Sequence, residues 1–216
     1  MSTATNALRF GFLMFPAFEE LDLVGPWEMA TMGQAYAGGP QCVTVAETLG
    51  EVRCAKGLRV LPEHDYDSIG ALDYLLVPGG FSAFEAAKNP RTLDFVRRQA
   101  AGAQAVLSVC SGAFILQAAG LLQGRRATTH WKAIPGLRAL GVAVEEERFV
   151  HDGLVWTSAG VSAGIDMMLA FIAHTAGEQA AYLTQFNAEY YPDGQRHGSP
   201  QTHPEAPDYV RRLGVA

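Results

Sequence analysis

The stretch AVLSVCSGAFILQAAGLL, residues 105–122, decides the fold. Its first five residues form a short apolar run, which is typical of a strand buried on both faces of a parallel sheet. Its last ten residues have the apolar content of a helix that packs on such a sheet, and only Cys110, Ser111 and Gly112 stand between the two patterns. A strand that turns so sharply into a helix is typical of a nucleophile elbow, where a strained turn exposes a reactive side chain. We therefore predict that Cys110 lies at such an elbow.

Further apolar runs of strand length alternate with helical patterns on both sides of this stretch. Strands are expected at residues 8–15, 42–46, 73–77, 127–129 and 142–145, with a β-excursion at 52–60 and a hairpin that turns at Asp152-Gly153. Helices are expected at residues 21–32, 113–122, 132–140, 162–176, 178–190 and 208–213, and another begins at Asn89 as N-cap with Pro90 in its first position. This alternation predicts an α/β fold, a three-layer sandwich with a mostly parallel central sheet of the flavodoxin-like kind.

The length and composition favour one domain without nucleic-acid or membrane partners. A chain of 216 residues that is 49% hydrophobic can bury one sizeable core, so we expect a single domain over residues 1–216. Residues 191–216, rich in Pro, Gly and His, are expected to form a tail that wraps the surface. The net charge of −6 opposes binding to polyanions. The sequence has neither a signal-peptide pattern nor an apolar run of bilayer length, which predicts a cytoplasmic protein.

The three cysteines differ in their sequence contexts. Cys42, Cys54 and Cys110 form neither a CxxC pair nor an even-numbered set, which predicts free thiols and no thiolate metal site. Cys42 and Cys54 fall within or beside strands, where a buried thiol usually only packs. Cys110 is expected at the carboxyl end of a central strand, where open α/β sheets bind ligands. The positive end of the following helix dipole favours the thiolate, so Cys110 is the candidate nucleophile.

Two loops expected at the same end of the sheet supply further candidates. Pro78-Gly79-Gly80 ends a neighbouring strand, and its backbone N–H groups, with that of Ser111, are suited to a developing negative charge; the alternative is a plain tight turn. Asp22 follows the first strand between apolar neighbours. It is either a helix cap or exposed acid, or a carboxyl that faces the thiol, in which case desolvation raises its pKa and fits it for proton transfer.

Two histidines are candidate partners of the thiol. His130 follows the elbow helix in the string Thr128-Thr129-His130-Trp131, and the favoured interpretation is a hydrogen-bonded structural residue. His203 is followed two positions later by Glu205, which is compatible with a Cys-His-Glu triad. The polar, Pro-rich tail around His203 offers no preceding strand to hold it, so the triad is the less favoured alternative.

Several ordered motifs together resemble those of the ThiJ/PfpI superfamily, which has the class I glutamine-amidotransferase-like fold. They are LDLVGP at residues 21–26, PGG at 78–80, SVCSGAFILQAAGLLQGRRATTHW at 108–131 and GVSAGID at 160–166. Within the superfamily the chain is most similar to the isocyanide hydratases, which also carry a C-terminal EY…GSP pattern, here at residues 189–190 and 198–200. The resemblance covers nearly the whole chain.

This resemblance implies a site and a partner. It implies that Cys110 is the nucleophile, Asp22 its acidic partner and Ser111 the neighbouring hydroxyl. The candidate substrate- and oxyanion-binding residues around them are Gly79, Gly80, Val161 and His130. The resemblance also implies a homodimer that needs no metal or organic cofactor. The peptidase-like and deglycase-like branches place His after the Cys or Glu in the first-strand loop, where this chain has Ser111 and Asp22. Isocyanide hydratases usually carry Thr where this chain has Ser111, which affects substrate range more than mechanism.

The expected activity is therefore the hydration of isocyanides to N-substituted formamides. Thiolate attack on the isocyanide carbon, with proton donation by Asp22, gives a Cys110 thioimidate that water hydrolyses. Two alternatives stay open: another cysteine-dependent hydrolase or stress-type protein of the superfamily, and a non-catalytic ligand-sensing domain related to AraC-type regulators. The regulators continue into a basic helix-turn-helix region, and the sequence through Ala216 has no such pattern. The enzyme is therefore expected over the sensor.

Overall fold

Seven strands form the central sheet of the computed structural model, which describes residues 7–192 and 199–213. Their order across the sheet is β10–β11–β7–β6–β1–β2–β5, and every neighbouring pair is parallel except β10 with β11. The strands are β1 (Arg9–Leu13), β2 (Gln41–Ala46), β5 (His64–Asp65), β6 (Tyr74–Val77), β7 (Ala105–Val109), β10 (Phe149–Asp152) and β11 (Val155–Ser158). The mostly parallel sheet predicted from the apolar runs is confirmed.

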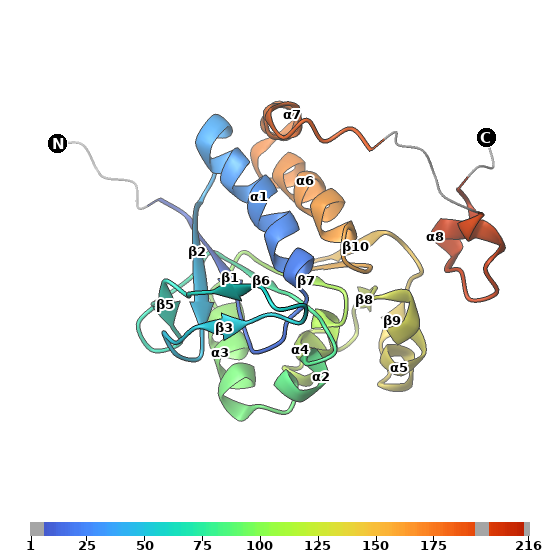
Figure 1. The fold of residues 1–216 in the computed structure, drawn as a ribbon, viewed down its shortest axis with the longest axis horizontal. Coiled ribbons are helices and arrows are strands. Elements are labelled where there is room, and N and C mark those ends of the chain that lie inside the picture. Colours follow the sequence, from blue (N-terminus) through green and yellow to red (C-terminus); the bar gives the residue numbers. More distant parts are fainter. Residues whose placement is uncertain (1–6, 193–198, 214–216) are drawn as a thin grey trace.

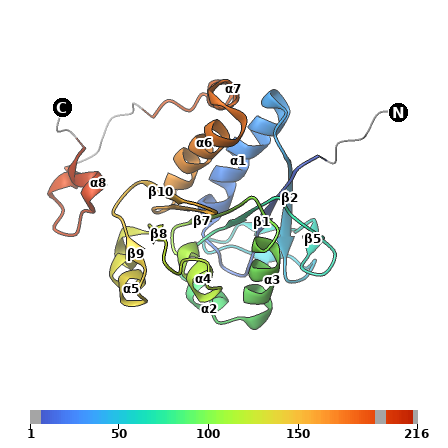
Figure 2. The same ribbon diagram turned by 180° about the vertical axis from the view of Figure 1, so that it is seen from behind.

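Helices cover both faces of this sheet, so the three-layer sandwich is also confirmed. One layer contains α1 (Glu20–Ala37), α6 (Ala163–Ala176) and α7 (Glu178–Asn187), and the opposite layer contains α2 (Ala83–Ala86), α3 (Pro90–Ala100) and α4 (Gly112–Ala118) (Figures 1 and 2). The helix α3 begins as its sequence predicts, because the side chain of Asn89 accepts a hydrogen bond of 2.9 Å from the Arg91 N–H and Pro90 occupies the first turn.

Several helices differ from their predicted limits: α1 continues to Ala37, beyond the expected end at residue 32, and α7 ends at Asn187, before the expected end at residue 190. The helix expected at residues 113–122 ends at Ala118, and the turn beyond it contains Gly120 with a φ of 86°, a left-handed conformation that stops a helix. The helix expected at 132–140 is divided into η1 (Trp131–Ala133), a 3-10 turn, and α5 (Ile134–Ala139). Pro135 lies in the first turn of α5, where its missing N–H does no harm but where it cannot continue a preceding helix.

The smaller elements lie outside the central sheet. The excursion predicted at residues 52–60 is the hairpin of β3 (Val52–Arg53) and β4 (Arg59–Val60), which turns at Gly57 with a φ of 100°. Two more short strands, β8 (Arg126–Ala127) and β9 (Ala143–Val144), pair in parallel. They replace the longer strands expected at 127–129 and 142–145.

The described part of the C-terminal tail contacts the region around α5. It contains η2 (Pro200–Thr202) and α8 (Asp208–Arg211), which lie beside α5 and β9 in both views (Figures 1 and 2). The ring centroids of His203 and Trp131 are 5.7 Å apart, and the Asp208 N–H donates a 3.1 Å hydrogen bond to Glu146. Residues 193–198 and 214–216 of the predicted tail lie outside the described residues. Across the described part of the chain, every helix is too short or too polar to cross a bilayer.

Candidate active site

Four parallel strands end at one edge of the sheet, and the residues that follow them meet there. The segment after β1 enters α1, which carries Asp22; Gly79 follows β6; Cys110 follows β7; and Val161 comes shortly after β11. The strand order reverses direction between β1 and β6, because β2 lies on one side of β1 and β6 on the other. Ligands bind outside the carboxyl ends of the strands at such a reversal, so the topology favours a site at this edge.

Cys110 occupies a strained turn between β7 and α4. Its φ is 58°, a left-handed conformation that L-residues seldom adopt, and its side chain is buried. Hydrogen bonds hold this turn on both sides: the Cys110 N–H donates to the carbonyls of Ser158 and Ala159 at 3.1 Å each, and the Cys110 carbonyl accepts from the side-chain hydroxyl of Thr129 at 2.8 Å. The turn also needs glycine at position 112, because an added Cβ there would lie 2.4 Å from the Val77 carbonyl oxygen.

Val161 is the second strained residue beside the thiol. Its φ is 49°, which is unusual for a β-branched residue, and it stands at the start of the turn into α6. Its backbone N–H and the backbone N–H of Ser111 both act on the Cys110 thiol in the direction that lowers its pKa. The strain at Val161 therefore aims a backbone donor at the sulfur.

Asp22 lies fully buried in the first turn of α1. The Gly79 N–H donates a 2.9 Å hydrogen bond to Asp22 Oδ2, whereas Oδ1 has no hydrogen-bond partner of ordinary geometry among the described residues. Burial raises the pKa of Asp22 to about 7, and the charge of Glu19 raises it further; the Gly79 N–H and the Cys110 thiol act in the opposite direction. The exposed-acid and helix-cap interpretations are thus wrong, because the side chain is inside and bonds to a neighbouring loop.

The low thiol pKa expected for Cys110 is also wrong. Burial raises the pKa of the Cys110 thiol to about 12, and the Asp22 carboxylate beside it contributes in the same direction. The Ser111 and Val161 donors and the short helix α4 do not compensate for this desolvation. Cys110 therefore rests as a thiol, and a nearby base has to take its proton before it can act as a nucleophile.

The Gly79-Gly80 loop fixes the two side chains around the sulfur. Besides the Gly79–Asp22 bond, the Gly80 N–H donates to the Ser111 hydroxyl at 2.9 Å, and that hydroxyl lies 2.7 Å from the Gly80 carbonyl and 4.0 Å from Cys110 Sγ. Both glycine N–H groups are therefore occupied, which contradicts their expected role as free donors to a negative charge. A Cβ on Gly79 lies 2.6 Å from the Ser111 nitrogen, so only glycine lets the loops come this close.

The structure brings His130 to the site but not His203. His130 is partly buried with its ring against Gly160, and burial lowers its pKa. Its Nδ1 accepts a 3.2 Å hydrogen bond from the Lys132 N–H, which leaves the proton on Nε2; within the described residues it makes no hydrogen bond to Cys110. His203 is exposed on the tail, where it contacts Trp131, and the Cys-His-Glu arrangement is not formed.

A pocket of about 350 Å³ opens over the sulfur. Its lining includes two aromatic side chains that the sequence argument did not single out, although Phe81 directly follows the Pro78-Gly79-Gly80 motif. The lining residues are Glu19, Gly80, Phe81, Phe84, Cys110, Ser111, His130, Lys132 and Ala133. Most of this surface is apolar, which suits a small molecule with a hydrophobic group.

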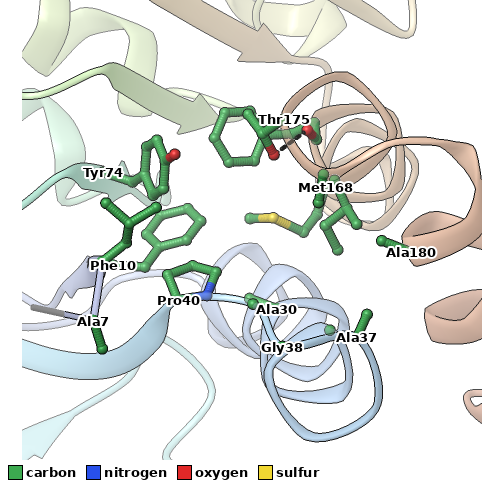
Figure 3. Close-up of a pocket in the computed structure, with 16 residues that line it drawn as sticks. Ala7, Phe10, Ala30, Ala37, Gly38, Pro40, Tyr74, Met168, Thr175 and Ala180 are labelled. Atoms are coloured by element: carbon green, nitrogen blue, oxygen red, sulfur yellow. Dashed lines mark hydrogen bonds between the residues drawn. The ribbon is translucent and has the colours of Figure 1, made fainter. Parts of the chain in front are cut away.

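A second pocket lies at the opposite, amino-terminal end of the strands. It has a volume of about 190 Å³ and is enclosed by the start of β1, β6 and the distal ends of α1 and α6 (Figure 3). Phe10, Met168 and Phe171 dominate its wall, and its polar side chains are Tyr74 and Thr175, of which the latter already donates to the Phe171 carbonyl. Its lining contains no cysteine, histidine or acid, so this pocket offers no thiol, imidazole or carboxyl group of the kind found beside Cys110.

Comparisons with known proteins identify relatives of this chain and its family. The isonitrile hydratase of Pseudomonas putida is 40% identical over 201 residues, which are 93% of this chain and 86% of that protein. The HTH-type transcriptional regulator CdhR of Pseudomonas aeruginosa is 31% identical over 80% of this chain, which spans about half, 52%, of the regulator. A solved ThiJ/PfpI family protein from Pseudomonas syringae has a TM-score of 0.84 and 34% identity, covering 98% of this chain and 88% of its own. Because residues 9–174 also match the DJ-1/PfpI family, this chain belongs to that family.

Proposed function

We propose that this protein hydrates isocyanides to N-substituted formamides through a covalent intermediate on Cys110. The observation that carries the proposal is the pairing of a buried thiol with a buried carboxyl of raised pKa, Asp22. An isocyanide carbon takes up a nucleophile and a proton at the same atom, so a thiol with a proton carrier beside it supplies both groups that the addition needs. The 40% identity to an isonitrile hydratase, isonitrile being another name for isocyanide, supports the same reaction.

The first step is addition of the thiol across the isocyanide carbon. Asp22, as the carboxylate, accepts the thiol proton while the sulfur attacks the isocyanide carbon. The raised pKa of Cys110 does not prevent this step, because the sulfur carries negative charge only while the new bond forms. The proton then moves from Asp22 to the isocyanide carbon. The product is the thioimidate R–N=CH–S–Cys110, with the Ser111 and Val161 N–H groups directed at the sulfur.

The second step is hydrolysis of this thioimidate. Water adds to the C=N carbon while Asp22, ionised again, takes a proton from the water and delivers it to nitrogen. Cleavage of the C–S bond then releases R–NH–CHO, and the proton of the added hydroxyl returns to the sulfur through Asp22. The sum is R–NC plus H2O giving R–NH–CHO, a reaction that consumes no electrons and in which Asp22 and Cys110 end as they began.

The test is formamide formation from a panel of alkyl and aryl isocyanides. We expect turnover by the wild type and essentially none by Cys110→Ala. Mass spectrometry of the wild type during turnover should detect an adduct on Cys110. Cys42→Ala is the matched control, because Cys42 is also buried but lies on β2 away from this pocket. Formamide formation that persists in Cys110→Ala contradicts the mechanism. Tight binding of isocyanides without turnover favours the ligand-sensing alternative.

The same proposal includes a homodimer in the cytoplasm. Helix α1 exposes apolar side chains, namely Leu21, Val24 and Tyr36, which are 38%, 38% and 54% exposed. An isologous contact between two copies removes such apolar side chains from water.

A further inference from the structure

We infer that Phe81 and Phe84 form the binding wall for the group R of the isocyanide, and that Phe81 determines a preference for substrates in which R is a bulky, uncharged ring. This inference rests on the proposed function, and it adds the substrate class and a specificity-determining residue. Both side chains line the pocket that contains Cys110. A molecule bonded to the sulfur through its isocyanide carbon has to project R into this pocket.

Phe81 is unusually exposed for an aromatic side chain beside a reactive group. Its exposed fraction is 93%, although it directly follows Gly80 and precedes α2, both of which are well anchored. Gly80 bonds to Ser111, and the Ser82 hydroxyl donates to the Ala17 carbonyl at 2.7 Å. The backbone thus presents an unpacked ring at the pocket, and contact with a ligand removes apolar surface from water.

Phe84 gives this wall a fixed base. Its ring lies edge-on to that of Phe114, with the centroids 4.8 Å apart, and Phe114 is buried on α4, the helix that follows Cys110. Phe84 itself remains 38% exposed. One aromatic ring is therefore held by the core next to the elbow, and the other projects freely beside it.

The charges in the pocket favour an uncharged R group. Glu19 is ion-paired with Lys56, and the ammonium of Lys132 lies 5.0 Å from the centre of the Trp131 ring. Burial lowers the pKa of His130, which favours its neutral form. The volume of about 350 Å³ is at the lower end for small-molecule pockets, and it accommodates one ring-sized group beyond the reacting carbon.

The experiment compares cyclohexyl and phenyl isocyanide with ethyl isocyanide in the wild type and in Phe81→Ala. We expect kcat/KM for both ring substrates to fall about tenfold in Phe81→Ala, mainly through KM, because a hydrophobic contact made equally in the ground and transition states is lost. The value for ethyl isocyanide should change by less than about twofold, since its R group is too short to reach the wall. Phe81→Leu, which keeps apolar bulk, should recover most of the ring preference.

Phe186→Ala is the control, because Phe186 is also an exposed phenylalanine, 56%, but lies on α7 in the opposite helix layer. An unchanged ratio of ring to ethyl substrates in Phe81→Ala overturns the inference, and so does an equal loss for all three substrates. A shift in oligomeric state with unchanged selectivity assigns Phe81 to a subunit contact instead. If the wild type hydrates none of the isocyanides, the proposed function fails, an outcome distinct from hydration without Phe81-dependent selectivity.

Discussion

At the scale of single residues, Asp22 and Cys110 behave as one unit that holds a single exchangeable proton. Each is buried; the Asp22 carboxylate raises the pKa of the Cys110 thiol, whereas the hydrogen bond from that thiol lowers the pKa of Asp22. Between pH values of about 7 and 12 the stable arrangement is an ionised carboxyl next to a neutral thiol. That arrangement is ready for proton transfer from sulfur to carboxylate during attack, and it does not require a preformed thiolate.

The pH dependence of the reaction follows from this shared proton. We expect kcat/KM to rise as the pH increases through about 7, because Asp22 has to be ionised to accept the thiol proton. Asp22→Asn should lower kcat by about 10²-fold or more and abolish this rise. Initial rates of formamide formation between pH 5 and 9 check both points. A wild-type profile that is flat through pH 7 contradicts the role of Asp22 as proton acceptor.

The same carboxyl should reduce the stability of the fold at neutral pH. Its pKa is raised from the ordinary 3.8 to about 7, so the unfolded state loses the proton first and the free energy of unfolding falls as the pH rises through this window. Asp22→Asn removes the titration while its amide oxygen can still accept from Gly79. We expect the variant to be more stable than the wild type by about 2 kcal/mol at pH 8, and by clearly less at pH 4. Urea unfolding at the two pH values is the measurement, and an equal difference at both contradicts the argument.

At the scale of elements, the site exists because loops after four strands approach one another more closely than ordinary side chains allow. Gly79 lies against Ser111 and Asp22, and Gly112 lies against the carbonyls of Val77 and Pro78. On the other side, Arg148 ties the first turn of α6 to the loop before β10, with Nε donating to Asp166 at 2.7 Å and the guanidinium contacting the Ser162 hydroxyl at 3.1 Å. These contacts fix the spacing between the elbow and its neighbours.

Gly112 offers a direct test of that spacing. A Cβ at this position lies 2.4 Å from the Val77 oxygen and 2.7 Å from the Pro78 oxygen, and backbone cannot move aside as a side chain can. We expect Gly112→Ala to destabilise the protein by about 3 kcal/mol through overpacking. Gly102→Ala is the control, since a Cβ there meets nothing within 4 Å, and it should change stability by less than about 0.5 kcal/mol. Thermal and denaturant unfolding of the two variants distinguish them; similar stabilities rule out the close-approach argument.

At the scale of the whole molecule, the proposed dimer can be measured directly. Light scattering at micromolar concentration should give twice the chain mass of 23.2 kDa. Replacing Tyr36, which is 54% exposed on α1, by Glu should shift the protein towards the monomer, because a charge in an apolar contact is poorly solvated. A wild type that remains monomeric contradicts the dimer and leaves the fold and the Cys110 site unaffected.

The order of strands and helices was determined by the sequence, because its signals are local. The apolar run at 105–109 becomes β7, the Asn89-Pro90 pair starts α3, and the Asp152-Gly153 turn joins β10 to β11. Buried parallel strands need continuous apolar residues, and caps and turns need particular residue types, so each of these features can be identified without its neighbours in space. The position of Cys110 at the carboxyl end of β7 follows from the same local pattern.

Tertiary structure alone decided the electrostatics and the partners of the site. Whether Asp22 is exposed or buried depends on a loop 57 residues away that supplies the Gly79 N–H. The pKa of the Cys110 thiol is raised by burial, an effect that the helix dipole argued from the sequence does not include. The N–H groups of Gly79 and Gly80 donate to side chains of other loops. Phe84 is held beside the pocket by its contact with Phe114. Burial and hydrogen-bond partners are sums over residues distant in the chain, so they are fixed only when the sheet brings its loops together.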